Sequence, residues 1–240
     1  METKKNIKLK IALVCVLAFL IVLIGGFYIY TLSYYRADST AVASMTAADV
    51  MIDRRGNDII FRPSPDKDLS TALIFYPGGK VEYIAYAPLL EQLTREGLTC
   101  VLVKMPFNLA FFNLSAADRV YELLPEIKNW YIGGHALGGV MASSYVWKDS
   151  THVRGLVLLG AYPFTSSSLP TLAVYGSEDV KLEKKKLEGV KNVVEIMGGN
   201  SAGFGNYGDQ FGDGTATITR EDQQAQTVRA VMDFIGNKNK

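Results

Sequence analysis

One short segment has the spacing of a catalytic turn but lacks the atom that would do the chemistry. The apolar run Trp130-Tyr131-Ile132 enters Gly134-His135-Ala136-Leu137-Gly138, and a helical stretch rich in small residues follows. This is the spacing G-x-S-x-G, in which a tight strand-to-helix turn strains the central residue and needs very small neighbours. The central position, where a serine would attack a carbonyl, is Ala136, and Gly134 and Gly138 flank it.

Histidines are scarce in this chain, which has only two of them in 240 residues. That number leaves little room for a histidine-based metal site and only two candidates for a catalytic base. Asp209 and Asp213 lie in a glycine-rich stretch but lack the pattern of an EF-hand calcium loop. We therefore expect no metal and no cofactor.

The elements that must position the turn alternate between short apolar strands and helices. Strands are expected near 72–76, 100–103, 130–132, 156–159, 172–175 and 193–196, and helices near 88–96, 115–125, 140–147, 181–188 and 219–235. A hairpin over 50–61 precedes them. The strands are continuous apolar runs, which favours an α/β fold with a mostly parallel sheet covered by helices on both faces. The connection 160–170 is too short for a large lid domain.

This pattern resembles the alpha/beta-hydrolase superfamily, and more narrowly the membrane-anchored bacterial family-5 group of that fold. The resemblance covers the whole chain after its N-terminal segment. Gly78-Gly79-Lys80 follows the first long strand, where the family has its oxyanion loop. The resemblance implies an oxyanion hole formed by the backbone N–H groups of Gly79 or Lys80 together with that of Leu137.

The same resemblance assigns the remaining catalytic positions. Asp179, just past a strand end, corresponds to the acid of the triad, and Ser201, in the glycine-rich segment 198–205, occupies the position of the catalytic histidine. Ala136 has no oxygen or sulfur for attack, and a hydroxyl at 201 does not accept and return a proton as imidazole does. Loss of such groups removes most of the rate, about 10⁶-fold in one measured triad. The scaffold is complete and the chemistry is missing.

Neither histidine is expected to replace the lost base. His135 is adjacent to the nucleophile position, and neighbouring side chains on such a turn diverge, so we expect it to pack beside the elbow. His152 precedes the strand at 156–159 and should lie at the opposite, N-terminal edge of the sheet.

Two origins of Ala136 remain open. One is an engineered serine-to-alanine change that silences a working serine hydrolase, and the other is natural loss of function. One change suffices for silencing, so the second loss, at position 201, favours natural decay or a new role.

The N-terminus predicts a membrane anchor. Residues 11–30 carry no charge, the uncharged stretch extends to Tyr35, and about twenty helical residues span a bilayer core. Lysines precede it, which by the positive-inside rule keeps the N-terminus cytoplasmic. The rival interpretation is a cleaved signal peptide ending near Ala41-Val42-Ala43, although the apolar run is longer than the usual h-region. A buried core helix is disfavoured by the flanking lysines.

The expected organisation is a cytoplasmic N-terminus at 1–10, a transmembrane anchor at 11–35, a linker at 36–47 and an extracytoplasmic hydrolase-like domain at 48–240. Residues 1–36 hold five basic and one acidic side chain, whereas the remainder holds 20 basic and 23 acidic, so the ectodomain offers no polybasic patch. A net charge of +1 argues against nucleic-acid binding, and two cysteines exclude a disulfide scaffold. Cys100 should pack as a small hydrophobe.

These observations predict a membrane-anchored protein of an ester or acyl hydrolase lineage that is inactive or strongly impaired as written. An open cleft with the amides of Gly79, Lys80 and Leu137 would then bind a small ester or acyl ligand at the cell surface. The alternatives are a working hydrolase whose nucleophile was substituted and a structural surface protein with no cleft. The sequence identifies no protein partner.

Overall fold

The protein is described by a computed structural model that covers residues 2–46, 48–67, 69–166 and 168–238. It divides into two compact units, Met1–Tyr34 and Tyr35–Lys240. Residue 1 of the expected cytoplasmic segment, residue 47 of the expected linker and residues 239–240 of the expected domain lie outside the described residues.

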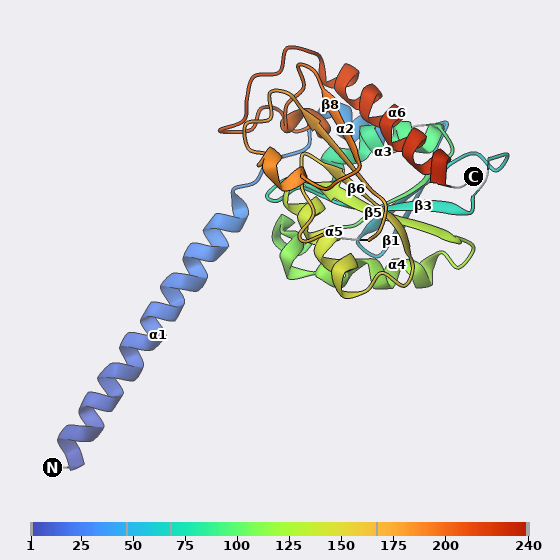
Figure 1. Cartoon of the computed structure of the whole chain (residues 1–240). Helices are drawn as coiled ribbons and strands as arrows, with labels where there is room; N and C mark the ends of the chain where they lie inside the picture. The colour runs from blue at the N-terminus through green and yellow to red at the C-terminus, as the bar shows by residue number, and fades with distance from the viewer. Residues whose placement is uncertain (1, 47, 68, 167, 239–240) are drawn as a thin grey trace. The chain divides into compact units, whose positions relative to one another are not determined.

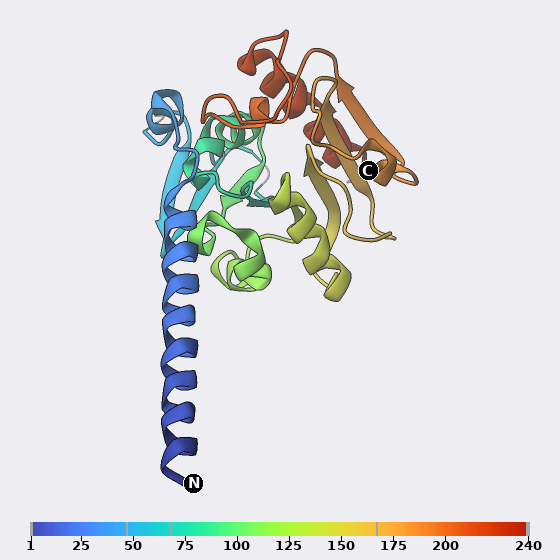
Figure 2. The ribbon, with the colours of Figure 1, turned by 90° about the vertical axis from the view of Figure 1, so that its left-hand side faces the viewer.

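The first unit is one uninterrupted helix, α1 (Glu2–Leu32), drawn in Figures 1 and 2. Within the described residues, its portion Asn6–Leu32 is the one helix long and apolar enough to cross a membrane. Its large apolar side chains, such as Leu13 and Val22, are exposed within the chain, as a segment without an internal core requires.

The second unit is built on an eight-stranded sheet with the order β1-β2-β4-β3-β5-β6-β7-β8. Its strands are β1 (Met51–Arg55), β2 (Asp58–Arg62), β3 (Thr71–Tyr76), β4 (Thr99–Leu102), β5 (Asn129–His135), β6 (Val153–Leu159), β7 (Thr171–Gly176) and β8 (Asn192–Ile196). The β1–β2 and β2–β4 pairs are antiparallel, and all other pairs are parallel. The expected hairpin and mostly parallel sheet are therefore confirmed.

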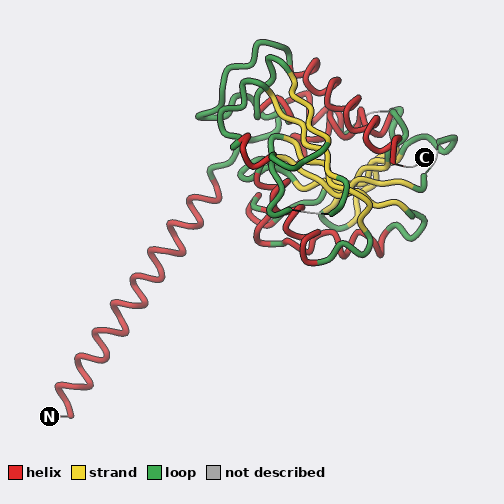
Figure 3. Tube along the Cα trace, viewed as in Figure 1, coloured by secondary structure: helices red, strands yellow, loops and turns green. Residues whose placement is uncertain are grey.

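Helices cover both faces of the sheet, as Figures 1 and 3 show. They are α2 (Ser39–Ser44), α3 (Ala87–Arg95), α4 (Asp118–Leu123), α5 (Leu137–Lys148) and α6 (Arg220–Lys238). Alternate side chains of β3 point to opposite faces: Leu73 and Phe75 join the core under α3 and α6, and Ile74 joins the core under α4 and α5. This burial on both faces explains why β3 reads as a continuous apolar run.

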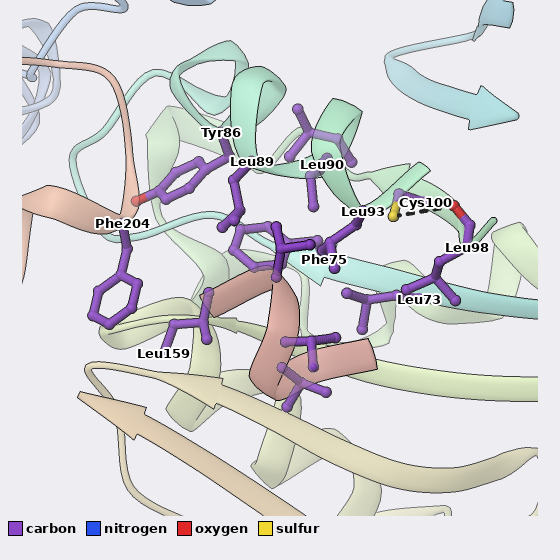
Figure 4. Packing of buried hydrophobic residues seen from close by; sticks show 14 of the residues in the cluster. Leu73, Phe75, Tyr86, Leu89, Leu90, Leu93, Leu98, Cys100, Leu159 and Phe204 are labelled. Carbon is purple, nitrogen blue, oxygen red and sulfur yellow. Dashed lines mark hydrogen bonds between the residues drawn. The ribbon is translucent and has the colours of Figure 1, made fainter. Parts of the chain in front are cut away.

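The core on the α3 face lies directly beneath the candidate site. Figure 4 shows Leu89, Leu90 and Leu93 of α3 packed over Phe75, with Tyr86 at the end of this row. Cys100 is buried there, and burial raises the pKa of its thiol to about 12, so it packs as a small hydrophobe as expected.

One crossover lacks a helix, as expected, and another differs from the expected pattern. The chain passes from β6 to β7 through residues 160–170 without a helix among its described residues. The expected helix at 181–188 is only a 3-10 turn, η5 (Lys184–Leu187), because its consecutive lysines give it no apolar stripe to bury.

Segment 36–47, which we expected to be a linker, belongs in its described part to the folded unit. Asp38 caps α2 by accepting a hydrogen bond from the Ala41 amide at 2.9 Å, and the Ala41 side chain is buried. The folded unit begins at Tyr35, ahead of the expected start at 48.

Candidate active site

The turn between β5 and α5 has the geometry of a nucleophile elbow. Ala136 adopts φ 47° and ψ −120°, a left-handed backbone conformation that a residue with a Cβ rarely adopts. Its amide donates a hydrogen bond to the Leu159 carbonyl at 2.9 Å, which fixes the turn to β6. The strain that the G-x-S-x-G spacing implies is therefore present, with a methyl group in place of a hydroxyl.

The flanking glycines are required by contact with backbone rather than by flexibility alone. A Cβ on Gly134 would overlap the Tyr76 carbonyl oxygen, and a Cβ on Gly138 would overlap the carbonyl oxygens of both Tyr76 and Pro77. The end of β3 thus presses against both sides of the elbow, which permits no side chain at either position.

The structure brings two of the three expected oxyanion donors together. Gly79 lies against the Leu137 side chain, where a Cβ would approach Leu137 Cδ2 to 2.8 Å. Within the described chain, no acceptor is recorded for the Gly79 or Leu137 amide. The expectation for Lys80 is wrong in this structure, because its amide donates to the Asn108 carbonyl at 2.8 Å.

The three remaining polar groups of the site converge over Gly160, the residue after β6. A Cβ on Gly160 would lie 3.1 Å from Asp179 Oδ2, 3.4 Å from Ser201 Oγ and 3.5 Å from His135 Cδ2. The fold therefore gathers the acid and histidine positions beside the elbow.

Asp179 is held in place through one oxygen only. Its Oδ1 accepts hydrogen bonds from the amides of Lys181 at 3.0 Å and Leu182 at 3.1 Å. Its Oδ2 is buried and has no partner among the described residues. Burial raises the pKa of this carboxyl to about 6, so the site holds a carboxylate that its surroundings destabilise.

His135 bridges the elbow to the Ser201 loop. Its Nδ1 lies 2.8 Å from Tyr86 Oη and its Nε2 lies 3.2 Å from Ser201 Oγ. Tyr86 Oη also accepts a hydrogen bond from the Gly78 amide at 3.0 Å. If the imidazole proton is on Nε2, each of these hydrogen bonds has one donor and one acceptor: Tyr86 donates to Nδ1, and His135 donates from Nε2 to Ser201.

The expectation that His135 packs beside the elbow agrees with its burial, whereas its contact with Ser201 was not anticipated. His135 is 1% exposed and Ser201 is 2% exposed. Burial lowers the pKa of the imidazole to about 3, because the charged form loses its hydration there. His152 is exposed at the start of β6, as expected, against the Tyr121 ring.

A buried amide network, which the sequence did not reveal, fixes the Ser201 loop to α6. Gln223 accepts a hydrogen bond from the Asn200 amide at 3.0 Å and donates to the Asn200 carbonyl at 2.7 Å. Gln224 donates to Asn206 Oδ1 at 2.8 Å. The sequence signal that was available is the pair of adjacent glutamines on an amphipathic helix. Buried side-chain amides need hydrogen-bond partners, so such a pair indicates a polar contact between this helix and another segment.

Asp213 is a brace for the same loop. Its Oδ2 accepts a hydrogen bond from the Ala202 amide at 2.8 Å, and its Oδ1 accepts one from the Gly214 amide at 2.9 Å. Among the described residues, no group of three or more histidine, cysteine, aspartate or glutamate side chains is placed to hold a metal ion.

The expected open cleft does not appear among the main pockets. Among the described residues of the folded unit, the main pockets have volumes of about 410–870 Å³, and none of these is lined by Ala136, Gly79 or Leu137. Asp179 lines one of them, but from the side of η5. At the elbow itself, Ala136 is half-buried.

The sheet order and the strained elbow define an alpha/beta-hydrolase-type protein. The model of the alpha/beta hydrolase family matches residues 72–225, and the chain belongs to this family. No curated protein sequence matches the chain significantly.

Solved structures share the fold at low sequence identity. A Thermus thermophilus protein is 14% identical with a TM-score of 0.57, over 79% of this chain and 98% of that one. A dienelactone hydrolase from Anabaena variabilis is 15% identical with a TM-score of 0.55, over 77% and 98%. A fungal esterase from Rhizomucor miehei is 15% identical with a TM-score of 0.56, over 84% and 87%.

Proposed function

We propose that this chain is a membrane-anchored, extracytoplasmic member of its family that does not hydrolyse esters as its sequence stands and acts through binding. The observation that carries the proposal is the strained elbow with Ala136 at its centre, because the geometry that activates a nucleophile is built around a methyl group. The amides of Gly79 and Leu137 remain suited to the oxygen of a small ester, acyl or carboxylate ligand.

Membrane anchoring is supported by the first unit. Helix α1 contains the apolar portion Asn6–Leu32, and the lysines at its start favour a cytoplasmic N-terminus. The chain should therefore stay with membranes after alkaline carbonate extraction, and external protease should reach the folded unit in intact cells. Release of the chain by carbonate would contradict the anchor.

A second candidate is hydrolysis with Ser201 as a displaced nucleophile, which one observation favours. Ser201 Oγ lies 3.2 Å from His135 Nε2, within reach of a base. Against it, both side chains are buried from substrate, and an imidazole whose pKa is lowered to about 3 is a weak base near neutral pH.

Activity-based labelling distinguishes the candidates. The full chain in detergent micelles is treated with a fluorophosphonate probe and, separately, with a short-chain aryl ester. We expect neither labelling nor hydrolysis. Labelling that maps to Ser201, and is lost in Ser201→Ala, would overturn the proposal in favour of the displaced nucleophile.

The reverse substitutions test whether the scaffold descends from a working hydrolase. Ala136→Ser combined with Ser201→His should hydrolyse the aryl ester, since it supplies both missing groups. The matched control, Ala136→Ser with Ser201→Ala, has the nucleophile without a base and should stay inactive. A well-folded double revertant without activity would indicate that the site has been remodelled for another ligand.

A further inference from the structure

Four exposed phenylalanines lie on two loops of the folded unit. Phe107, Phe111 and Phe112 follow β4, and Phe211 follows β8; their exposed fractions are 50%, 46%, 45% and 92%. The rings of the first group contact one another, with centroids 5.4 Å apart for Phe107 and Phe112 and 4.2 Å apart for Phe111 and Phe112. We call these four residues the aromatic rim. Exposed apolar groups gathered in this way mark an interaction surface.

The backbone holds the first loop in a constrained form. Phe107 and Asn108 have φ values of 54° and 56°, in the left-handed region that bulky side chains avoid. The Asn108 carbonyl accepts the Lys80 amide at 2.8 Å, which ties this loop to the one that carries Gly79. Strain of this kind persists only where surrounding contacts enforce it, so the exposed rings are presented by a built loop.

Tyr35, the residue at which the folded unit begins, is bonded directly to one of these loops and is linked to the other through Lys80. The Tyr35 amide donates to the Lys80 carbonyl at 2.8 Å, and the Tyr35 carbonyl accepts the Glu82 amide at 2.8 Å. On the other side, Tyr35 Oη accepts the Phe211 amide at 3.0 Å. Tyr35 therefore contacts the Phe211 loop itself and reaches the loop of Phe107 through Lys80, whose amide donates to the Asn108 carbonyl.

The covalent chain limits how far Tyr35 can lie from the apolar helix. Helix α1 ends at Leu32, three residues earlier, and consecutive Cα atoms are about 3.8 Å apart, so Tyr35 stays within about 11 Å of the helix end. This limit holds for any orientation of the two units. If α1 spans a bilayer, Tyr35 lies near its surface, together with the Phe211 loop bonded to it and the Phe107 loop linked to it through Lys80.

We propose that the aromatic rim rests in the interfacial layer of the membrane that α1 spans; this rests on the proposed anchoring. Aromatic rings favour that layer, where their apolar bodies leave water without entering the hydrocarbon centre. The folded unit has more acidic than basic side chains, so the rim binds a zwitterionic phosphatidylcholine surface without needing anionic lipid.

Tryptophan quenching by brominated lipid tests this directly. The full chain, with Trp130→Phe and Trp147→Phe as background, is placed in phosphatidylcholine nanodiscs without bromine or with bromine along the acyl chains, near the headgroup for the rim reporters and near the chain ends for the α1 reporter. Single reporters are Phe111→Trp and Phe211→Trp in the rim, Phe19→Trp in α1, and Val193→Trp in β8. Val193 is 41% exposed, which matches Phe111 and makes it the control.

Fluorescence of the two rim reporters and of the α1 reporter should be lost in brominated nanodiscs, and that of the Val193→Trp control should be retained. Loss at Phe19→Trp alone would overturn the inference while leaving the anchor intact. No loss at Phe19→Trp would overturn both the anchor and the inference. Rim reporters that are unquenched but shift to the blue with rising protein concentration would instead assign the surface to a second copy of the chain.

Discussion

His135 Nε2 lies 3.2 Å from Ser201 Oγ, inside the core and next to the strained elbow. The contact continues through Nδ1 to Tyr86, and from Tyr86 to the Gly78 amide. One buried row of polar groups thus joins the Gly78 loop, the end of β5 and the Ser201 loop. Each of these buried groups depends on its neighbour for a hydrogen bond. We therefore expect this row of hydrogen bonds to support the structure rather than to transfer protons.

Removing the Tyr86 hydroxyl should therefore destabilise the folded unit without any effect on packing volume. Tyr86→Phe leaves the Gly78 amide and His135 Nδ1 without a buried partner, which should cost about 1–3 kcal/mol in the free energy of unfolding. Urea denaturation followed by the emission of buried Trp130 measures this. Tyr83→Phe removes a hydroxyl from a half-buried ring and should change the value by less than about 0.5 kcal/mol. Equal effects of the two would contradict the support role.

His135 should make the fold sensitive to acid. Its pKa is about 3 in the folded chain against 6.5 in the unfolded chain, so the unfolded chain binds the extra proton between these values. The contribution of His135 to stability is present above pH 6.5 and is lost as the pH falls towards 3, by up to about 5 kcal/mol. Titration of Asp179 changes stability in the opposite direction, so the test is made in Asp179→Asn, which lacks that carboxyl. In this variant, the free energy of unfolding should fall as the pH decreases from 6.5 to 3. A flat profile in that variant would contradict a buried neutral imidazole.

Asp179 should act in the opposite direction. Its pKa is raised to about 6, so the folded chain binds the extra proton between pH 6 and 3.8, and stability falls as the pH rises through this window. Asp179→Asn removes the buried charge and should raise the free energy of unfolding at pH 7 by about 1–2 kcal/mol, with the gain vanishing near pH 4. Asp209→Asn, in an exposed loop, is the control and should change the free energy of unfolding by less than about 0.5 kcal/mol. A loss of stability in Asp179→Asn at pH 7 would show that the carboxylate has a partner.

The elements of the fold that the sequence predicted correctly are those with strong local sequence signals. The apolar run around Ile74 predicts a strand because both faces of β3 are buried, and Thr219 predicts the start of α6, where its hydroxyl accepts the Asp222 amide at 3.1 Å. The glycines around Ala136 predict the elbow because contact with the end of β3 excludes any side chain. In each case the signal lies in the residue itself or in its sequence neighbours, even where the contact that explains it is with a distant element.

Long-range contacts could not be read in the same way. The contact of His135 with Ser201 depends on two elements far apart in the sequence, and nothing near either residue signals it. The Lys80 amide looked available as an oxyanion donor because the turn at Asn108, which occupies it, has no glycine to indicate a left-handed backbone. The segment after Tyr35 looked like a linker because its few apolar residues gain their burial from α3 and η1 (Tyr83–Tyr86).

The strain at Ala136 predicts a stabilising substitution at the centre of the site. Glycine adopts φ 47° and ψ −120° without the steric cost that a Cβ imposes, so Ala136→Gly should raise the free energy of unfolding by about 1 kcal/mol despite the greater freedom of glycine in the unfolded chain. Ala136→Ser should be nearly neutral, since serine keeps the Cβ. Destabilisation by Ala136→Gly, measured by urea denaturation, would show that the turn is unstrained.

The flanking glycines give the converse test, because there the backbone contact rather than the backbone angle is limiting. Gly138→Ala would place a methyl group into the carbonyl oxygens of Tyr76 and Pro77, and separating β3 from the elbow should cost several kcal/mol, about 3 or more by analogy with overpacked cores. Gly236→Ala is the matched control, since a Cβ there meets no atom within 4 Å on α6. It should stabilise the chain by about 0.5–1 kcal/mol through its higher helix propensity. If Gly138→Ala were as well tolerated as Gly236→Ala, β3 would not be packed against the elbow, and the tight turn at Ala136 would lose its structural basis.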